Sequence, residues 1–289
     1  METKQLGSTD ITISAIGLGG MPMSISGRPD EAQSIEVIHR ALDLGVTLID
    51  TADSYCKDES DKHHNERLIA KALQEYQGNA NVTIATKGGL MRPNGDWTRN
   101  GNPEHLQETI RTSFEALGGE KPIDIWQYHA PDTKYSIEES LKPVAEAVKS
   151  GLIRFVGVSN FSVEQIKRAS EVVDIVSVQN QYNPWHRQPE FDGVLEYCDR
   201  QNLTFLPWSP LGGSRRASKL GDIKAIARVA KTKGVSVYAI VLAWVRAKSP
   251  CIVPIPGASK VSSIEDSVKS VQVKLSLEEV QQIDNETAA

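Results

Sequence analysis

Cysteine is scarce in this chain of 289 residues, and the few that occur lie far apart. The three cysteines, Cys56, Cys198 and Cys251, form no CxxC pair, which excludes the metal and redox sites that depend on that spacing. An odd number of widely spaced cysteines also gives no paired disulfide framework. We therefore expect three reduced thiols.

Long apolar runs and clusters of basic residues are also missing. No run of about 18 apolar residues occurs, and the opening METKQLGSTD has no apolar core of a secretory signal. The Lys and Arg residues are scattered, and the formal net charge is -5. Nucleic acid and anionic membrane are therefore poor partners on grounds of charge. We expect a cytoplasmic protein whose partner is a small molecule.

What the sequence does contain is a regular alternation of β-branched runs and amphipathic stretches. Each run predicts a strand, because it is short, apolar and followed by turn residues. The stretches between them carry apolar residues at helical spacing. The predicted strands are residues 15–20, 46–50, 82–87, 123–129, 153–159, 174–179, 203–208 and 251–255. The predicted helices are 30–42, 65–76, 103–119, 136–151, 162–173, 189–201, 222–234, 236–248, 259–271 and 276–286.

Eight strand-helix units without an intervening linker indicate one domain over residues 1–289. Strands that alternate with helices imply an α/β protein with a parallel sheet covered on both faces. Eight units in this length favour a closed (β/α)8 TIM barrel over an open sheet. Residues 4–14 contain a turn between two short extended runs, so we also predict an N-terminal β-hairpin.

Titratable side chains follow three successive predicted strands. Asp50 ends the second strand and Tyr55 follows it, while Lys87 ends the third strand and His129 the fourth. The active site of a (β/α)8 barrel lies on the loops at the C-terminal ends of its strands. These four side chains should therefore converge on one rim. Turn carboxylates and surface lysines are common, but four such residues at successive strand ends are a more demanding pattern.

This set of residues suits acid catalysis at a carbonyl group. A nearby ammonium lowers the pKa of a tyrosine by favouring the phenolate, and Lys87 can supply that charge. Asp50 would pair with Lys87 and keep it protonated, and His129 could donate a hydrogen bond that orients the substrate oxygen. Tyr55 would then protonate the oxygen as hydride reaches the carbon.

Seven short motifs occur in the order and spacing of the aldo-keto reductases: LIDTADSY, IATK, QYH, GVSNF, VQNQYN, PWSPLGG and IPGAS. The chain therefore resembles this family over nearly its whole length. The resemblance implies NADPH-dependent reduction of aldehydes, and more slowly of ketones, on a (β/α)8 barrel. It also implies that Asp50, Tyr55, Lys87 and His129 are the catalytic residues.

The cofactor cannot be held by a Rossmann fingerprint, because Pro22 stands where GxGxxG would continue. The resemblance implies instead that Ser159, Asn160 and Gln179 bind the nicotinamide carboxamide and that Trp208 stacks on the ring. Trp208 as a packing residue alone is the alternative. The remaining positions implied for the cofactor are Gly20, Met21, Asp50, Ser209, Leu211, Gly213, Gly257, Ser259, Lys260 and Ser263.

The adenosine end of the proposed cofactor site departs from the best-known family members. Those proteins have a Lys where this chain has Gly257 and an Arg where it has Ser263. Lys260 and Ser259 remain as candidate ligands of the 2′-phosphate. NADPH is therefore the expected cofactor, with NADH as a secondary one.

Two other functions fit parts of the same pattern, and two histidines raise the question of a metal site. Lys87 could form a Schiff base in an aldolase, although Asp50 opposes the neutral amine this needs. A cofactor-binding regulatory subunit is the second alternative, since part of the family has that role.

His63 and His64 are adjacent and cannot share one helix face, so we expect no metal. Trp97 is the candidate aromatic wall of the substrate pocket, or else packs within its own loop.

Overall fold

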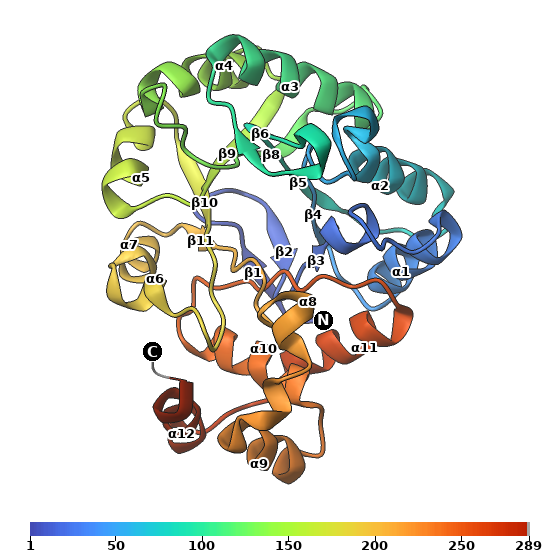
Figure 1. Cartoon of the computed structure of the whole chain (residues 1–289), viewed down its shortest axis with the longest axis vertical. Helices are drawn as coiled ribbons and strands as arrows, with labels where there is room; N and C mark the ends of the chain where they lie inside the picture. Colours follow the sequence, from blue (N-terminus) through green and yellow to red (C-terminus); the bar gives the residue numbers. More distant parts are fainter. Residues whose placement is uncertain (288–289) are drawn as a thin grey trace.

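The computed structural model describes residues 1–287, which form a parallel sheet ringed by helices (Figure 1). Seven parallel strands lie side by side in the order β11-β10-β9-β8-β5-β4-β3. Each pairs with its neighbour in sequence, as expected when a helix crosses over between consecutive strands. Their bounds are β3 Leu18–Gly19, β4 Leu48–Asp50, β5 Thr83–Gly88, β8 Ile123–Tyr128, β9 Ile153–Ser159, β10 Ile175–Gln179 and β11 Thr204–Phe205.

Residues 251–257 close the sheet into a barrel. The amides of Gly17 and Gly19 donate to the carbonyls of Pro254 and Pro256 at 2.8 and 2.9 Å, and the amide of Val253 donates to Phe205 on the other side at 2.9 Å. The two prolines have no amide hydrogen, so this segment cannot form the full ladder of a regular strand. The predicted eighth strand is thus present as an irregular extended segment, and the (β/α)8 barrel is confirmed.

The helices cover the outside of this barrel, and the longer ones bury apolar side chains against the strands or against neighbouring helices. Several begin where the sequence supplies a cap: Ser136 and Ser162 each form a capping box with the residue three positions on. The helix bounds are α1 Glu31–Asp43, α2 His64–Glu75, α3 Pro103–Ala116, α4 Ile137–Lys149, α5 Val163–Ser170, α6 Gln188–Phe191, α7 Val194–Arg200, α8 Gly213–Ala217, α9 Lys224–Lys233, α10 Val237–Ala247, α11 Val261–Lys269 and α12 Leu277–Thr287.

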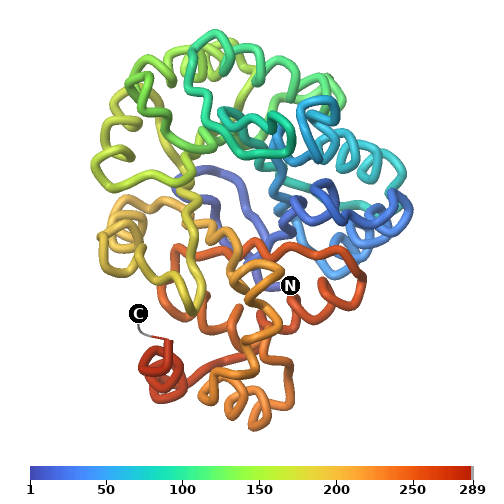
Figure 2. The backbone as a smooth tube through the Cα atoms, viewed as in Figure 1, coloured from blue at the N-terminus to red at the C-terminus, as the bar shows by residue number. Residues whose placement is uncertain are grey.

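The predicted N-terminal hairpin is present and fills the end of the barrel opposite the active-site loops. Its strands β1 (Thr3–Gln5) and β2 (Thr12–Ser14) are antiparallel. Leu6 and Ile13 are fully buried and pack in one cluster with side chains from the strands, among them Leu48, Ala85 and Ile125. The backbone trace in Figure 2 shows the hairpin crossing the middle of the ring of helices.

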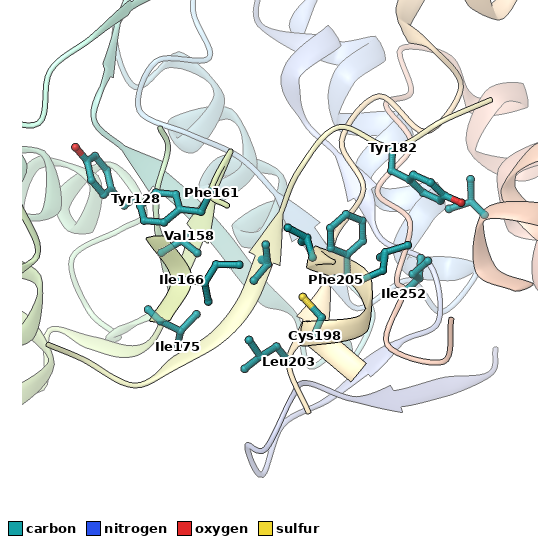
Figure 3. Close-up of a cluster of buried hydrophobic side chains, with 14 of the residues drawn as sticks. Tyr128, Val158, Phe161, Ile166, Ile175, Tyr182, Cys198, Leu203, Phe205 and Ile252 are labelled. Atoms are coloured by element: carbon teal, nitrogen blue, oxygen red, sulfur yellow. The ribbon is translucent and has the colours of Figure 1, made fainter. Parts of the chain in front are cut away.

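A second apolar layer lies between the strands and the outer helices. In Figure 3 this layer runs from Tyr128 and Phe161 to Tyr182 and Phe205, across β8 to β11. Tyr128 and Phe161 meet edge to face, with 5.7 Å between their ring centroids. Such packing fixes the strands, and therefore the positions of the residues at their ends.

Three elements differ from the prediction. Gly193, at φ +82°, divides the helix predicted at 189–201 into α6 and α7. The loop after β5 contains a small hairpin of β6 (Leu90–Met91) and β7 (Thr98–Arg99), and the loop after β11 contains α8. Within residues 1–287, the structure has no helix with the length and apolarity to cross a bilayer.

Candidate active site

The four candidate catalytic residues meet at the C-terminal ends of neighbouring strands. Asp50 is the last residue of β4, Lys87 lies near the end of β5, and His129 follows β8 directly. Tyr55 lies in the loop after β4. All four are at least nine-tenths buried, and Lys87 has no exposed surface at all. The convergence expected from the strand ends is present.

The ammonium of Lys87 is the centre of this group. Its Nζ lies 2.7 and 2.8 Å from the two carboxylate oxygens of Asp50, 2.7 Å from the carbonyl oxygen of Thr51 and 2.9 Å from the hydroxyl of Tyr55. An ammonium has three hydrogens to donate, and here it has three partners. This geometry orients Lys87 toward Tyr55 and occupies the nitrogen that a Schiff base would require.

Burial controls the protonation of these groups. It raises the pKa of Tyr55 well above the ordinary value, and the charge of Asp50 adds to this effect. The net pKa of Tyr55 is therefore raised and not lowered as expected, because desolvation of the phenolate is the largest effect. Burial also lowers the pKa of Lys87, while Asp50 opposes that change. Tyr55 is thus held as a phenol.

His129 is a neutral imidazole beside the Tyr55 ring. Burial, with a smaller contribution from Lys87, lowers the pKa of His129 well below its ordinary value. The ring centroids of Tyr55 and His129 are 5.8 Å apart, and Trp97 lies 6.4 Å from each of them. The Nδ1 atom of His129 is buried without a hydrogen-bond partner. A neutral imidazole in this position can donate one hydrogen bond to a substrate oxygen.

A chain of polar side chains continues from Asp50 toward β9 and β10. Gln179, at the end of β10, donates from Nε2 to Asp50 at 2.8 Å, and Ser159 donates to the carbonyl of Gln179 at 2.8 Å. Asn160, at φ +63°, donates to the carbonyl of His129 at 3.0 Å and accepts from Trp208 Nε1 at 3.1 Å. The structure therefore brings all four predicted nicotinamide ligands together with the catalytic group.

The predicted pyrophosphate residues lie in the loop that follows Trp208. Ser209 has a φ of +48°, and its carbonyl accepts from Asn183 at 3.0 Å and from the amide of Gly212 at 2.8 Å. Leu211 packs against the apolar core, and Gly213, at φ +73°, begins α8. Two glycines with positive φ give this loop a backbone that can approach a ligand closely.

Gly257 and Gly20 lie where the first and last parts of the barrel meet. Gly257 bridges Gly19, and a Cβ on Gly257 would lie 2.6 Å from the ring of Pro22. A Cβ on Gly20 would lie 2.3 Å from Asn65 Oδ1, so glycine is needed there for packing. Met21 follows at the start of a short 3₁₀ turn and is partly exposed.

The predicted phosphate residues surround the start of α11. Lys260 is exposed and is the N-cap residue of this helix, and Ser263 is exposed on its first turn. The carbonyl of Ser259 accepts from Gln33 Nε2 at 2.6 Å, which ties this segment to α1. Lys260 is therefore free to swing toward an anion at the helix N-terminus, where a negative charge is favoured.

Sequence reasoning missed Arg92, which supports the site from outside. Its guanidinium carbon lies 3.9 Å from the centroid of the Trp97 ring, on the side chain that faces Tyr55 and His129. Arg92 is 5% exposed, and its Nη2 donates to the carbonyl of Lys57 at 3.2 Å. The contact of Arg92 with Trp97 could not be predicted from the sequence, because only the turn of the hairpin β6–β7 brings the two side chains together.

The family description "Aldo/keto reductase family" matches residues 15–287. The chain belongs to the aldo-keto reductase family. It is therefore related to oxidoreductases that use a nicotinamide cofactor.

Individual relatives agree with this family assignment. The chain is 38% identical to an uncharacterized oxidoreductase of Schizosaccharomyces pombe, over 96% of this chain and 88% of that protein. It is 31% identical to the pyridoxine 4-dehydrogenase of Escherichia coli, over 94% of each. A crystal structure of a thermostable aldo-keto reductase in complex with the inhibitor epalrestat aligns with a TM-score of 0.84 and 32% identity, covering 99% of this chain and 100% of that one.

The residues present fit the nicotinamide dinucleotide that aldo-keto reductases use. Amide and hydroxyl groups of Ser159, Asn160 and Gln179 lie beside the catalytic group, as a carboxamide requires. The indole of Trp208 is half-buried next to them, and the loop after it supplies positive-φ glycines. In the part of the chain that is described, no cluster of His, Cys, Asp or Glu suits a metal ion.

Proposed function

We propose that this aldo-keto reductase reduces aldehydes, and more slowly ketones, to alcohols with NADPH, and that Tyr55 is the general acid. One observation carries the proposal: the hydroxyl of Tyr55 lies 2.9 Å from the Nζ atom of Lys87, which in turn contacts Asp50. A phenol so placed has a cation ready to stabilise the phenolate that forms when its proton leaves.

Each catalytic side chain has one task in this reaction. Tyr55 holds the proton and gives it to the carbonyl oxygen. Lys87 stabilises the resulting phenolate through the 2.9 Å contact, and Asp50 keeps the ammonium oriented and charged. His129 donates from its neutral ring to the same carbonyl oxygen and so fixes the substrate. NADPH, when bound, supplies the hydride.

The preference for aldehydes is supported by crowding around Tyr55. The rings of His129 and Trp97 lie 5.8 and 6.4 Å from that of Tyr55. A carbonyl carbon with one hydrogen needs less lateral room between these rings than one with two carbon substituents. The relative named for dehydrogenation of pyridoxine, an alcohol, supports interconversion of alcohols and carbonyls by this family.

The Schiff-base aldolase and the regulatory subunit are less well supported. Lys87 donates to three partners, so its nitrogen has no free lone pair in this arrangement. The complete buried tetrad supports turnover over mere binding. Borohydride treatment in the presence of an aldehyde should leave Lys87 unmodified, and a trapped adduct on Lys87 would favour the aldolase.

The activity is tested with the purified full chain and a panel of aliphatic and aromatic aldehydes and ketones. Loss of NADPH absorbance should occur with several aldehydes and at lower kcat/KM with the matched ketones. Absence of turnover on the whole panel, together with tight NADPH binding measured by fluorescence, would favour the regulatory alternative.

Cofactor preference is tested at the start of α11. Lys260 is exposed beside Ser259 and Ser263, and no acidic residue occurs in residues 256–260 to bind a ribose diol. Lys260→Ala should raise the KM for NADPH more than that for NADH. Lys269→Ala, at the other end of the same helix, is the matched control and should change neither. Equal effects of Lys260→Ala on both cofactors would remove Lys260 from the phosphate site.

A further inference from the structure

Four charged side chains join the last helix to the loop after β10, and the proposed reaction does not use them. Arg187 and Glu190 belong to the start of α6, Lys248 follows α10, and Asp284 lies on α12. The exposed fractions of these side chains are 7%, 15%, 12% and 24%, in that order. Charges removed from solvent to this extent are costly unless each is paired. We call these four residues the ionic cluster.

Every charge in the ionic cluster has a partner of opposite sign. Arg187 donates from Nε and Nη2 to the two carboxylate oxygens of Glu190, at 2.6 and 2.8 Å. Lys248 Nζ lies 2.8 Å from a carboxylate oxygen of Asp284 and 3.0 Å from one of Glu190. Arg187 also donates from Nη1 to the backbone carbonyl of Asp284 at 3.0 Å. Two cations and two carboxylates therefore hold α12 against α6.

Tyr182 connects the ionic cluster to the end of β10. Its ring is fully buried, and in Figure 3 its hydroxyl points away from Phe205. This hydroxyl donates to Glu190 at 2.6 Å. Burial would raise the pKa of Glu190, but hydrogen bonds from Arg187, Tyr182 and Lys248 outweigh burial and lower it to about 2. Glu190 therefore accepts from Tyr182 as a carboxylate at neutral pH.

The chain around Tyr182 holds the loop assigned to the nicotinamide and the pyrophosphate. The amide of Trp208 donates to the carbonyl of Asn180 at 3.1 Å, and the amide of Tyr182 donates to the carbonyl of Trp208 at 3.4 Å. Asn183 donates from Nδ2 to the carbonyl of Ser209 at 3.0 Å. Ser209 has a φ of +48°, and a residue other than glycine keeps such a conformation only where its surroundings fix it. The loop thus depends on these neighbours for its shape.

Arg187 fixes the turn that carries Asn183. The amides of Asn183 and His186 each donate to the carbonyl of the other, at 3.1 and 2.9 Å, and Arg187 follows directly. Tyr182 begins this segment and Arg187 ends it. Both ends of residues 182–187 are therefore anchored by contacts with Glu190.

We propose that the ionic cluster positions the cofactor: by fixing residues 182–187 against α12, it holds Trp208 and its loop in the conformation that binds the nicotinamide. Its members are positioning residues, because they act through Tyr182 and Asn183. Disturbing the cluster weakens cofactor binding and leaves proton transfer at Tyr55 nearly unchanged, since its contacts lead to the cofactor loop. This inference rests on the proposed cofactor site.

The first test compares the full-length wild type with Asp284→Asn, which keeps the shape of the side chain and removes its charge. The Kd of NADPH, measured by quenching of protein fluorescence, should rise by about 3- to 10-fold, with kcat changed by less than about twofold. Glu279→Gln is the matched control, because Glu279 lies on the same helix, is 19% exposed and pairs at 3.0 Å with Lys233 of α9. It should leave the Kd unchanged. No rise in Asp284→Asn, or an equal rise in both variants, would overturn the proposal.

A second measurement needs neither cofactor nor turnover. In hydrogen exchange of the free protein, the peptide that contains the Trp208 amide should exchange faster in Asp284→Asn than in wild type. The reason is that this amide bonds to Asn180, next to the segment that the ionic cluster holds. Peptides from β8 should be unaffected. Unchanged exchange at Trp208 would overturn the proposal.

Tyr182→Phe tests the same connection if Asp284→Asn fails to fold. It removes the hydroxyl bonded to Glu190 and keeps the ring stacked on Trp244, with 5.7 Å between the centroids. It should also raise the Kd of NADPH, and the double variant should bind no more weakly than the weaker single variant. Tyr182→Phe without effect, or effects that multiply in the double variant, would overturn the proposal.

These outcomes are separable from those of the proposed reaction. If wild type binds NADPH and reduces no carbonyl, the reductase function fails, and the binding and exchange results still decide the role of the ionic cluster. If wild type binds neither NADPH nor NADH, both proposals are overturned.

Discussion

The hydroxyl of Tyr55 is the smallest part of the site on which the proposed reaction depends. Tyr55→Phe removes this oxygen and keeps the ring that packs against His129 and Trp97. It should lower kcat by about 10²- to 10⁴-fold, because that is the usual contribution of a positioned acid. Steady-state kinetics and NADPH binding by fluorescence check the result.

Tyr238→Phe is the control for this substitution, since Tyr238 is 37% exposed on α10. It should leave kcat unchanged. Turnover of Tyr55→Phe within a few-fold of wild type would mean that another group protonates the carbonyl oxygen.

Asp53, which is fully buried in the loop after β4, also gives a prediction about stability. Its pKa is raised from 3.8 to about 6 in the folded protein, so folding favours the protonated form. The cost of the ionised carboxylate is absent below about pH 4, grows between about pH 4 and 6, and is complete above about pH 6. Since one pH unit of pKa difference corresponds to about 1.4 kcal/mol, the full cost is on the order of 3 kcal/mol.

Asp53→Asn should therefore raise the free energy of unfolding at pH 8 and leave it nearly unchanged at pH 4. Urea denaturation at the two pH values measures this difference. A variant that is destabilised equally at both pH values would mean that Asp53 contributes by packing or by an unrecognised hydrogen bond.

At the level of elements, the hairpin β6–β7 holds one wall of the site. Arg92 stacks on Trp97 with 3.9 Å between the guanidinium carbon and the ring centroid, while 45% of Trp97 stays exposed. Arg92→Met should loosen the indole and raise the KM for aromatic aldehydes by roughly 2- to 10-fold, with kcat little changed. Kinetics with benzaldehyde and propanal measure the effect.

Arg99→Met, on the exposed strand of the same hairpin, is the control and should behave as wild type. An equal rise in KM for benzaldehyde and propanal would indicate a general distortion of the loop, and the stacking explanation would then be wrong.

The elements that could be predicted from the sequence are those with a clear period. Helices such as α1 and α4 have an apolar face and a capping residue, and their predicted positions agree with the structure to within about two residues. The division of α6 from α7 was missed because it depends on one positive-φ glycine inside an otherwise helical pattern. The irregular extended segment at 251–257 was predicted as a strand over residues 251–255, although Pro254 cannot donate to a ladder.

Some features of the candidate site could likewise be predicted from the sequence, and others could not. Asp50, Lys87 and His129 could be brought together from sequence, because consecutive parallel strands end on the same rim. The protonation of Tyr55 could not, because burial outweighs the neighbouring ammonium and burial is a property of the folded protein. The burial of Asp53 could not be predicted either, since nothing in its neighbours along the chain indicates that its carboxylate is enclosed.

At the scale of the whole molecule, a substitution in the N-terminal hairpin tests whether the chain unfolds as a single cooperative domain. Leu6 is fully buried among side chains of the barrel strands. Leu6→Ala should lower the free energy of unfolding by about 2–5 kcal/mol through lost contacts and a residual cavity. If residues 1–289 form one domain, a single transition should remain in urea denaturation followed by fluorescence and circular dichroism.

Leu277→Ala is the matched control, because Leu277 is 91% exposed at the start of α12. It should leave the unfolding free energy unchanged. Two separate transitions in wild type, or a loss in Leu6→Ala confined to one of them, would contradict the single-domain prediction.

The hydrogen bonds of Gly17 and Gly19 with residues 251–257, which close the barrel, have a consequence for folding during synthesis. The amides of Gly17 and Gly19 leave the ribosome long before their acceptors, the carbonyls of Pro254 and Pro256. During most of synthesis the first strand therefore has an open edge, with amides that can pair with another nascent chain. The amides of Gly17 and Gly19 form their closing hydrogen bonds with proline carbonyls. These bonds therefore cannot form, even in part, before Pro254 and Pro256 leave the ribosome. A chain interrupted shortly before residue 254 would keep that edge exposed, so premature termination late in translation should produce aggregation rather than a soluble, nearly complete barrel.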